Sequence, residues 1–403
     1  MGEKLHLVNV SSAYLELPWR IVDVVRVDGV GPTIAPQLAQ FIHEPFGRDV
    51  RDLLLRLAGD ATSRHFGLAH RVLGEAFANA ARKVVDLTKQ TWQQVLAIGL
   101  SGHTVWHDAD GRFPSTLSLG MPAAVAERTG VTVVSDFRSR DLLVGGQGAV
   151  LTSAVDVPLF HDDQERRVLI HLGGLATVLW LPAESGLRDV IGFQAAPCTL
   201  MLDGLMRLLT GGRESFDPGG RNAVQGRCLE PLVERWLAHP FFKRKPPRSV
   251  PVYEFGRDFL EHAVELAKAE GGNLHDLLCT ATHFTARAIA ESVQRRLPAA
   301  PDRVLVSGGG ARNGLLWRLL EQQLDPAPME RTDRFGVPAE ARKSVGYAGL
   351  AALAMDAVPG NVPASTGATG PRLLGSFTPG DGANWARCLA WMAGQTAHRR
   401  LAA

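Results

Sequence analysis

Glycine-rich segments that follow apolar runs are the residues of this sequence best suited to chemistry. Three apolar runs end in glycines, at residues 99–102, 172–174 and 307–310. Glycine lets the backbone approach a ligand closely, and the amides of such a turn, or of a helix that begins after it, favour phosphate. A tight structural turn is the alternative for any single copy. Three copies together indicate two similar halves of the chain that face a nucleotide cleft.

No standard nucleotide or metal signature accompanies these glycines. The chain has neither Gly-x-x-x-x-Gly-Lys-Ser/Thr nor Gly-x-Gly-x-x-Gly, which argues against a P-loop and against a dinucleotide fold. His103 and His107 are four residues apart, but in a strand-like run this spacing leaves them well separated. The cysteines form no C-x-x-C pair. We therefore expect no metal-ligating cluster.

Two further side chains have alternative interpretations. Asp136 ends the apolar run 131–137, where a carboxylate either holds Mg²⁺ through water or pairs with Arg138 or Arg140. Cys198 precedes a helical pattern, so its thiol either has a lowered pKa at the helix start or is a small buried residue.

Strands and helices alternate along the chain, which is typical of an α/β protein. Apolar and β-branched runs predict strands within 5–30 and at 95–100, 131–137, 168–172, 178–181 and 304–307. Apolar residues at helical spacing predict helices at 64–90, 200–210, 224–238, 258–270, 276–297, from 315 onward and at 340–355. The basic segment 241–251 is expected to be a surface loop.

The composition bounds the class of protein. The chain has 403 residues, 45% of them hydrophobic and 21% charged, which suits two globular domains. A net charge of +2 implies no broad basic surface, so nucleic acid is not an expected partner. The N-terminus has no signal-peptide pattern, and no run reaches the roughly 18 apolar residues that cross a membrane. Four scattered cysteines fit a reducing compartment, so we expect a cytoplasmic protein.

Several segments together resemble the bacterial anhydro-N-acetylmuramic acid kinase family, part of the actin/hexokinase superfamily. The similarity covers about residues 95–375, with a weaker match at the N-terminus. The matching segments are Thr104–His107, Thr116–Gly120, Val133–Arg138, Gly145–Ala149, Gly173–Ala176, Leu200–Asp203, Gly308–Asn313, Pro359–Pro363 and Thr366–Ala368. Their order and spacing carry the resemblance.

The resemblance implies a two-domain actin/hexokinase-like (ribonuclease H-like) α/β fold with an interdomain nucleotide cleft, and it implies ATP with Mg²⁺. We expect an N-terminal domain at 1–140, completed by about 363–380, and a second domain at 141–362. Residues 381–403 are expected to form a helical extension beyond the family match. There Trp385, Leu389 and Met392 share one helical face, which either packs on its own domain or forms a homodimer contact.

The family's reaction needs a general base. A carboxylate activates water to open the 1,6-anhydro bond at C1, while O6 takes the γ-phosphoryl group of ATP, and the product is a sugar 6-phosphate of cell-wall recycling. The position of this carboxylate holds Gln194 here, because the family's Asp-Thr-Gly-Pro-Gly-Asn corresponds to Gln194–Thr199. An amide does not accept a proton near neutral pH. Asp203 is either a substitute base or a solvated or capping carboxylate.

Other family motifs are altered as well. Ser-Gly-Thr-Ser-x-Asp-Gly corresponds to Ser11–Leu17, where Tyr14 is bulky, and Ser-Thr-Gly-Arg-Glu corresponds to Ser249–Tyr253. The family's substrate-side glutamate aligns with Lys343. Residues expected to build the scaffold and the adenosine side survive, whereas those expected to perform the chemistry are changed.

The resemblance therefore assigns a site and leaves two hypotheses. By resemblance, the nucleotide contacts are Ser12, Gly173, Gly174, Gly308, Gly309, Gly310 and Asn313. The substrate contacts are Thr104, His107, Asp136, Arg138, Gln147 and Lys343, with Gln194 at the base position. One hypothesis is an ATP-dependent kinase for an anhydro-sugar. The other is a catalytically impaired or inactive relative that binds sugar or nucleotide as a sensor or partner protein.

Overall fold

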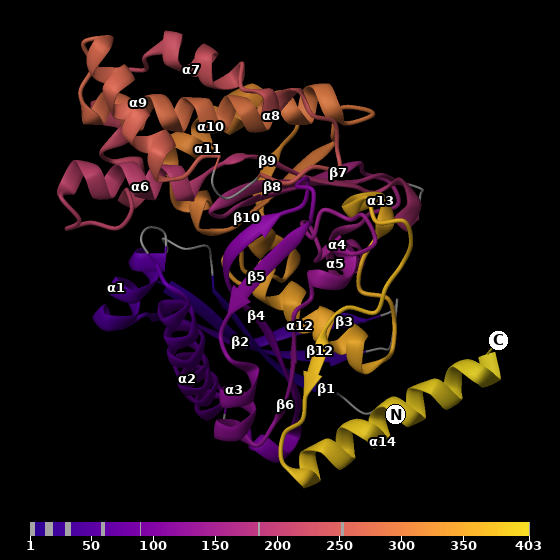
Figure 1. Ribbon diagram of the computed structural model, residues 1–403. Coiled ribbons are helices and arrows are strands. Elements are labelled where there is room, and N and C mark those ends of the chain that lie inside the picture. Colours follow the sequence, from indigo (N-terminus) through magenta and orange to yellow (C-terminus); the bar gives the residue numbers. More distant parts are fainter. Residues whose placement is uncertain are drawn as a thin grey trace. The chain divides into compact units, whose positions relative to one another are not determined.

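The computed structural model describes residues 5–12, 19–28, 34–57, 61–88, 90–183, 186–250 and 254–402. Internal contacts divide the chain into two units (Figure 1), each described here by itself. Unit 1 comprises Met1–Phe160 and Ala341–Ala403, and unit 2 is the continuous segment His161–Glu340.

Unit 1 is built on a seven-stranded mixed sheet with the order β12-β6-β4-β1-β2-β3, and β5 pairs with β4. Its strands are β1 (Leu5–Ser12), β2 (Trp19–Asp28), β3 (Ala35–Pro45), β4 (Val95–Asp108), β5 (Ser115–Leu119), β6 (Thr132–Ser135) and β12 (Ser376–Thr378). Strand β4 runs parallel to both β1 and β6, and the remaining pairs are antiparallel.

Helices cover both faces of this sheet. They are α1 (Arg48–Leu57), α2 (Ser63–Leu87), α3 (Pro122–Thr129), α4 (Ser139–Leu142), α5 (Ser153–Phe160), α12 (Arg342–Met355), α13 (Pro363–Thr366) and α14 (Gly382–Ala402), with a short turn η2 (Trp92–Gln94). Ile98 belongs to the apolar core that includes Phe77 of α2. Its neighbour Gly99 faces α12, because side chains alternate along a strand. A Cβ at Gly99 would lie 3.1 Å from the Tyr347 carbonyl oxygen, so glycine lets α12 pack closely.

Unit 2 has a five-stranded sheet with the order β11-β10-β7-β8-β9. The strands are β7 (Arg167–Leu172), β8 (Leu175–Leu181), β9 (Ile191–Pro197), β10 (Arg303–Ser307) and β11 (Met329–Arg331). Strand β10 is parallel to β7 and β11, whereas β7, β8 and β9 form an antiparallel meander.

The helices of unit 2 gather around one central helix. They are α6 (Thr199–Thr210), α7 (Glu230–Leu237), α8 (Pro240–Lys243), α9 (Arg257–Ala269), α10 (Leu274–Arg296) and α11 (Gly314–Leu324). Short 3₁₀ turns are η3 (Leu187–Asp189), η4 (Pro218–Gly220), η5 (Ala223–Gln225), η6 (Gly309–Arg312) and η7 (Thr332–Phe335). Helix α10 is buried on several faces, as expected for a helix packed on all sides. Its N-terminus is closed by a capping box between Asn273 and Asp276.

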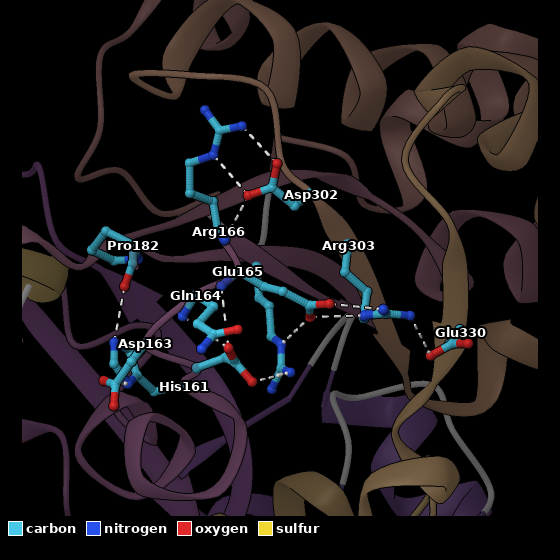
Figure 2. Close-up of polar contacts among 11 residues, drawn as sticks. His161, Asp163, Gln164, Glu165, Arg166, Pro182, Asp302, Arg303 and Glu330 are labelled. Atoms are coloured by element: carbon cyan, nitrogen blue, oxygen red, sulfur yellow. Dashed lines mark hydrogen bonds and ion pairs between the residues drawn. The ribbon is translucent and has the colours of Figure 1, made fainter. Parts of the chain in front are cut away.

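Ion pairs tie together the amino-terminal ends of the parallel strands in unit 2 (Figure 2). Arg303 binds the Glu165 carboxylate through two hydrogen bonds of 2.9 and 2.8 Å and reaches Glu330 at 3.0 Å. Arg167 also contacts Glu165, at 2.9 Å. The Arg303 hydrogen bonds, reinforced by Arg167, hold the pKa of Glu165 at about 2. This cluster lies at the sheet edge opposite the glycine turns of β7 and β10, and it fixes the strands that carry those turns.

The sequence-based elements match the structure at most places, and one expected turn is wrong. Strand β4 does not end in a turn at residues 99–102 but continues to Asp108. Gly102 lies within the strand with φ +67°, next to an irregularity in the β1–β4 register. Of the three glycine segments at 99–102, 172–174 and 307–310, the two after β7 and β10 end their strands, so the inference from three copies loses one of them.

The boundaries of the units differ from those expected. The sequence placed the division at residues 140/141 and 362/363, whereas contacts assign 141–160 and 341–362 to unit 1. Helix α14 also belongs to unit 1, and its inward face differs from the expected one. Asn384 and Cys388 are buried, while Leu389 is 49% exposed. The amide of Asn384 contacts Thr132 and Leu96, which fixes the first half of α14 on β6 and β4.

Candidate functional site

The residues assigned from the sequence fall into two groups, one in each unit. Unit 2 contains Gln194, Asn313 and the glycines at 173–174 and 308–310. Unit 1 contains Ser12, Thr104, His107, Asp136, Arg138, Gln147 and Lys343. The backbone of Ser12 ends β1. Tyr14 and Pro251 lie outside the described residues, so the expectations about them stay predictions, as does an interdomain cleft.

The two glycine turns of unit 2 lie side by side. Strands β7 and β10 are parallel, with Ser307 opposite His171, so the turns that follow them meet at one sheet edge. Gly308 has φ +91°, and a Cβ there would lie 2.5 Å from the Leu172 carbonyl oxygen. Glycine is required because any side chain would push the second turn away from the end of β7.

The turn after β10 has room for a ligand, and the turn after β7 is partly used by the protein. A Cβ at Gly309 would meet no atom within 4 Å. The carbonyl oxygens of Gly173 and Gly174 accept the amides of Thr199 and Cys198 at 3.0 and 2.9 Å. The first amides of α6 are therefore occupied, and phosphate contacts here would come from the turn itself.

Asn313 has a structural task in the same region. Its Oδ1 accepts the Leu316 amide at 3.1 Å and so caps the N-terminus of α11. A Cβ at Gly220 would lie 2.5 Å from this oxygen, so a second loop packs against the cap. Asn313 therefore holds the shape of the glycine turn, whether or not it also touches a nucleotide.

Gln194 is buried within β9 and its side chain has a defined partner. Its Oε1 accepts the Val250 amide at 2.6 Å, and Gln194 and Val250 are 4% and 1% exposed. In the side-chain amide of Gln194 the oxygen accepts hydrogen bonds and the nitrogen donates them. The bond from Val250 therefore also fixes which end of this amide is Oε1 and which is Nε2. The carbonyl oxygen that could orient a water molecule already accepts one backbone amide, which uses one of its two lone pairs.

Arg248 holds the backbone on either side of this contact. The backbone amide of Gln194 donates to the backbone carbonyl of Arg248 at 3.0 Å. The Arg248 Nε donates to the backbone carbonyl of Gln194 at 3.1 Å. The guanidinium also donates to the Arg244 carbonyl at 2.9 Å and to Ser292 Oγ at 3.0 Å. Burial, with smaller contributions from Arg296 and Arg244, lowers the pKa of Arg248 to about 10. The expected surface loop therefore contributes a buried arginine.

In unit 1, Thr104 and His107 lie on β4 beside β5. Thr104 Oγ1 is 3.1 Å from Ser118 Oγ, and His107 Nδ1 is 3.4 Å from Thr116 Oγ1. Burial, followed by the charge of Arg138, lowers the pKa of His107 to about 4, so the imidazole is neutral at physiological pH.

Two cations, Arg138 and Lys343, lie at the amino-terminal end of α12 in unit 1. Arg138 donates to the Gly148 carbonyl and, at 2.9 Å, to Tyr347 Oη. Burial and the charges of Arg138 and Arg342 lower the pKa of Lys343 to about 7. A pKa lowered in this way marks a place where an anionic group would be favoured, because it would relieve the repulsion between the cations.

Asp136 and Gln147 flank these cations. Asp136 has φ +53°, and its Oδ1 accepts the amide and hydroxyl of Ser139 at 3.2 and 2.7 Å, so the carboxylate orders the start of α4. Gln147 donates its backbone amide to the Thr366 carbonyl at 2.8 Å and its side chain to Asp110 at 3.2 Å. The structure thus brings the expected substrate residues of unit 1 into neighbouring segments.

Comparison with known proteins identifies the family. The family model for anhydro-N-acetylmuramic acid kinase matches residues 21–380. The protein of that name from Synechococcus elongatus is 37% identical over 363 residues, covering 88% of this chain and 94% of the relative. The one from Gloeobacter violaceus is 37% identical over 342 residues, covering 83% and 88%. The chain belongs to the anhydro-N-acetylmuramic acid kinase family.

Similar solved structures are more distant. An activator of 2-hydroxyisocaproyl-CoA dehydratase from Clostridium difficile with bound ADPNP has a TM-score of 0.42 and 12% identity, covering 85% of this chain and 93% of that one. A ROK hexokinase from Thermus thermophilus has a TM-score of 0.31 and 15% identity, covering 86% and 97%. These values carry no argument about function. Family membership confirms the resemblance and the α/β fold class predicted from it. Within the described part of the chain, no helix is both long and apolar enough to span a bilayer.

The structure decides between the two interpretations of Cys198, which lies four residues after the family's base position. Cys198 is fully buried, and burial together with the charge of Asp203 raises the pKa of its thiol. The hypothesis of an activated thiol at the start of α6 is therefore wrong, and the alternative of a small buried residue holds. Asp203 is itself only 5% exposed, which excludes the interpretation as a solvated carboxylate.

Two carboxylates of unit 1 were missed by the sequence analysis. Asp141 accepts the Gly148 amide at 2.9 Å, and Asn361 Nδ2 and Thr366 Oγ1 at 2.8 Å each. It thereby joins the Gln147 loop to Asn361, which precedes α13, and to Thr366 at the end of α13. Asp156 pairs with Arg342 in a fully buried site, next to Lys343. Asp141 lies in the stretch between the matching segments Val133–Arg138 and Gly145–Ala149 but was given no role, and the only signal of Asp156 was a charge within an apolar segment.

Proposed function

We propose that the protein transfers the γ-phosphoryl group of ATP to a hydroxyl group of an N-acetylmuramic acid-type sugar. The observation that carries this proposal is the match to the kinase family across residues 21–380, which includes both units. The cations Arg138 and Lys343 in unit 1 support an acidic sugar. Burial lowers the pKa of Lys343 most, and a sugar carboxylate would offset the positive charges of Arg138 and Arg342 that lower it further.

The glycine turns of unit 2 suit ATP. Gly308, Gly309 and Gly310, with Gly173 and Gly174, would hold the nucleotide, because Gly309 leaves open space above the turn. Asp136 would hold Mg²⁺ through water, in keeping with its exposed position at the end of β6. The nucleotide supplies the phosphoryl group, and the contribution of the chain is to position the acceptor and neutralise charge.

Hydrolytic opening of an anhydro bond is the step that Gln194 does not support. An amide takes no proton from water near neutral pH, and its oxygen already accepts the Val250 amide at 2.6 Å. Losing a general base typically slows a reaction by about 10²–10⁴-fold. A hydroxyl that attacks the γ-phosphate has less need of a strong base, because the transition state is loose. We therefore expect phosphorylation without efficient ring opening.

The glutamine at position 194, where the family has its general base, favours a second candidate function. A relative that binds sugar or nucleotide without turnover would keep the fold and the glycine turns and lose the base. In that case the protein would act as a sensor or as a partner of another protein.

Product analysis separates these functions. Purified protein, ATP and Mg²⁺ are incubated with 1,6-anhydro-N-acetylmuramic acid or with N-acetylmuramic acid, which has no 1,6-anhydro bond to open. Sugar phosphates are measured by mass spectrometry. Phosphate on the second sugar alone is the expected result. Phosphate on both would mean that another group acts as base, and Asp203→Ala and Asp136→Ala would identify it. No product, but saturable binding by calorimetry, would support the second candidate. If the protein forms no product and binds neither sugar nor nucleotide, both candidate functions are overturned.

A further inference from the structure

Three side chains from two distant parts of unit 2 converge beside α7 and α10. Cys228, Glu230 and His283 each place one ligand atom within 4.8 Å of the other two. Cys228 and His283 are half-buried, whereas Glu230 begins α7 and is exposed. None of these residues belongs to the glycine turns or to the surroundings of Gln194.

The backbone that carries Cys228 is fixed along α10. The Arg227 amide donates to Asp276 Oδ1 at 2.7 Å, and the Leu229 amide donates to Thr280 Oγ1 at 2.9 Å. Cys228 lies between these two contacts, so its position over α10 is defined on both sides. The converging side chains are therefore preorganised by the fold, which is what a binding site requires.

Cys279 lies near the group, although its thiol is not among the ligand atoms that lie within 4.8 Å of one another. It lies four residues before His283 on α10, so the two side chains share one helical face. Burial and the nearby Glu230 carboxylate raise the pKa of the Cys228 thiol to about 12, and Cys279 adds to this rise. Zinc binds the thiolate form of cysteine, so metal binding at Cys228 would release the thiol proton.

We propose that Cys228, Glu230 and His283 bind a zinc ion. One thiolate, one imidazole and one carboxylate are ligands that zinc accepts in a tetrahedral arrangement, with Cys279 or water in the fourth position. Zinc–ligand distances of about 2.0–2.3 Å place donors roughly 3.5 Å apart. The three ligand atoms lie within 4.8 Å of one another, so binding would bring them closer together.

Arg287 does not prevent this arrangement. Its guanidinium lies 3.7 Å from Glu230, but it makes shorter contacts of 2.6 Å with Glu234 and 3.2 Å with Glu291. When Glu230 turns to the metal, Arg287 keeps two carboxylate partners. The zinc would tie the segment before α7 to α10 and so stabilise unit 2.

Metal titration of the full-length protein tests the proposal. Zn²⁺ affinity is measured against a chromophoric chelator, and Co²⁺ serves as a spectroscopic probe of thiolate ligation. We expect one metal per chain, thiolate-to-cobalt charge-transfer absorption, and an affinity about 100-fold lower in Cys228→Ser and in His283→Gln. Cys279→Ser distinguishes a fourth cysteine ligand from water, because only the former changes the cobalt spectrum.

The matched control is Cys388→Ser, which removes a buried thiol of unit 1 and should leave binding unchanged. Circular dichroism without metal shows which variants fold. If Cys228→Ser does not fold, the affinity of His283→Gln tests the proposal. A cobalt spectrum without a thiolate band, or one that Cys228→Ser leaves intact, would overturn the proposal. So would equal loss of affinity in Cys388→Ser.

Discussion

Replacing Gln194 by aspartate is expected to destabilise the protein rather than restore a base. The Gln194 Oε1 to Val250 amide distance is 2.6 Å. An aspartate side chain is one carbon shorter, so its oxygen would recede by roughly 1.5 Å, beyond hydrogen-bonding distance. The Val250 amide is buried and would lose its partner, which costs about 1–3 kcal/mol of the free energy of unfolding.

Gln194→Glu is the matched variant. It carries the same charge as Gln194→Asp but keeps the length of glutamine, so its carboxylate still accepts the Val250 amide. The difference between the two variants therefore isolates the lost contact from the cost of a buried charge. For the same reason, Gln194→Asp should recover little ring opening, and Gln194→Glu is the better variant in which to look for it.

Urea unfolding and hydrogen exchange measure this difference. We expect Gln194→Asp to unfold at lower urea than Gln194→Glu, and the Val250 amide to exchange faster in Gln194→Asp only. Equal unfolding free energies, with the Val250 amide equally protected in both variants, would show that the 2.6 Å contact does not hold this segment in solution.

Three further predictions concern other residues. Arg342→Met should cost about 3–5 kcal/mol of unfolding free energy, because it leaves the buried Asp156 carboxylate unpaired, and adding Asp156→Leu should recover much of that loss in thermal unfolding. The folded pKa of Lys343, about 7, lies below the ordinary lysine value of 10.5, so the free energy of unfolding should rise with pH between these values. Lys343→Met should lack that rise, and equal slopes in the two proteins would contradict a lowered pKa. Gly308→Ala should disturb the fold, since its Cβ would meet Leu172, whereas Gly309→Ala should fold normally and weaken nucleotide binding in calorimetry. Unchanged binding in Gly309→Ala would remove that turn from the nucleotide site.

Local patterns predicted much of the fold. The apolar runs that became β7 and β10 were found because each is a short buried strand closed by glycine, and their parallel pairing then placed both turns at one sheet edge. The same pattern failed at Gly99 for a physical reason. That glycine makes room for α12, from a segment about 250 residues later, and no local rule contains such a contact.

The candidate site was only partly accessible from sequence. Gln194 was found by alignment with a family motif, but its bond to Val250 depends on a loop more than 50 residues away. Arg248 looked like one of several surface cations, because its neighbours Lys243 and Lys245 are equally basic. Its burial depends on carbonyl groups that point inward, and sequence patterns do not record the direction of a carbonyl group.

The continuity of unit 2 has a consequence for the order in which the chain folds. Residues 161–340 form one uninterrupted segment, whereas unit 1 needs α12 against β4 and β12 beside β6. During synthesis, the strands β1 to β6 leave the ribosome long before α12 covers them. Unit 2 can therefore complete its core first, while the earlier-made half of unit 1 keeps an uncovered sheet face. A ribosome stalled at the point where residue 340 has just emerged from the exit tunnel should hold a protease-resistant unit 2 attached to a protease-sensitive N-terminal segment.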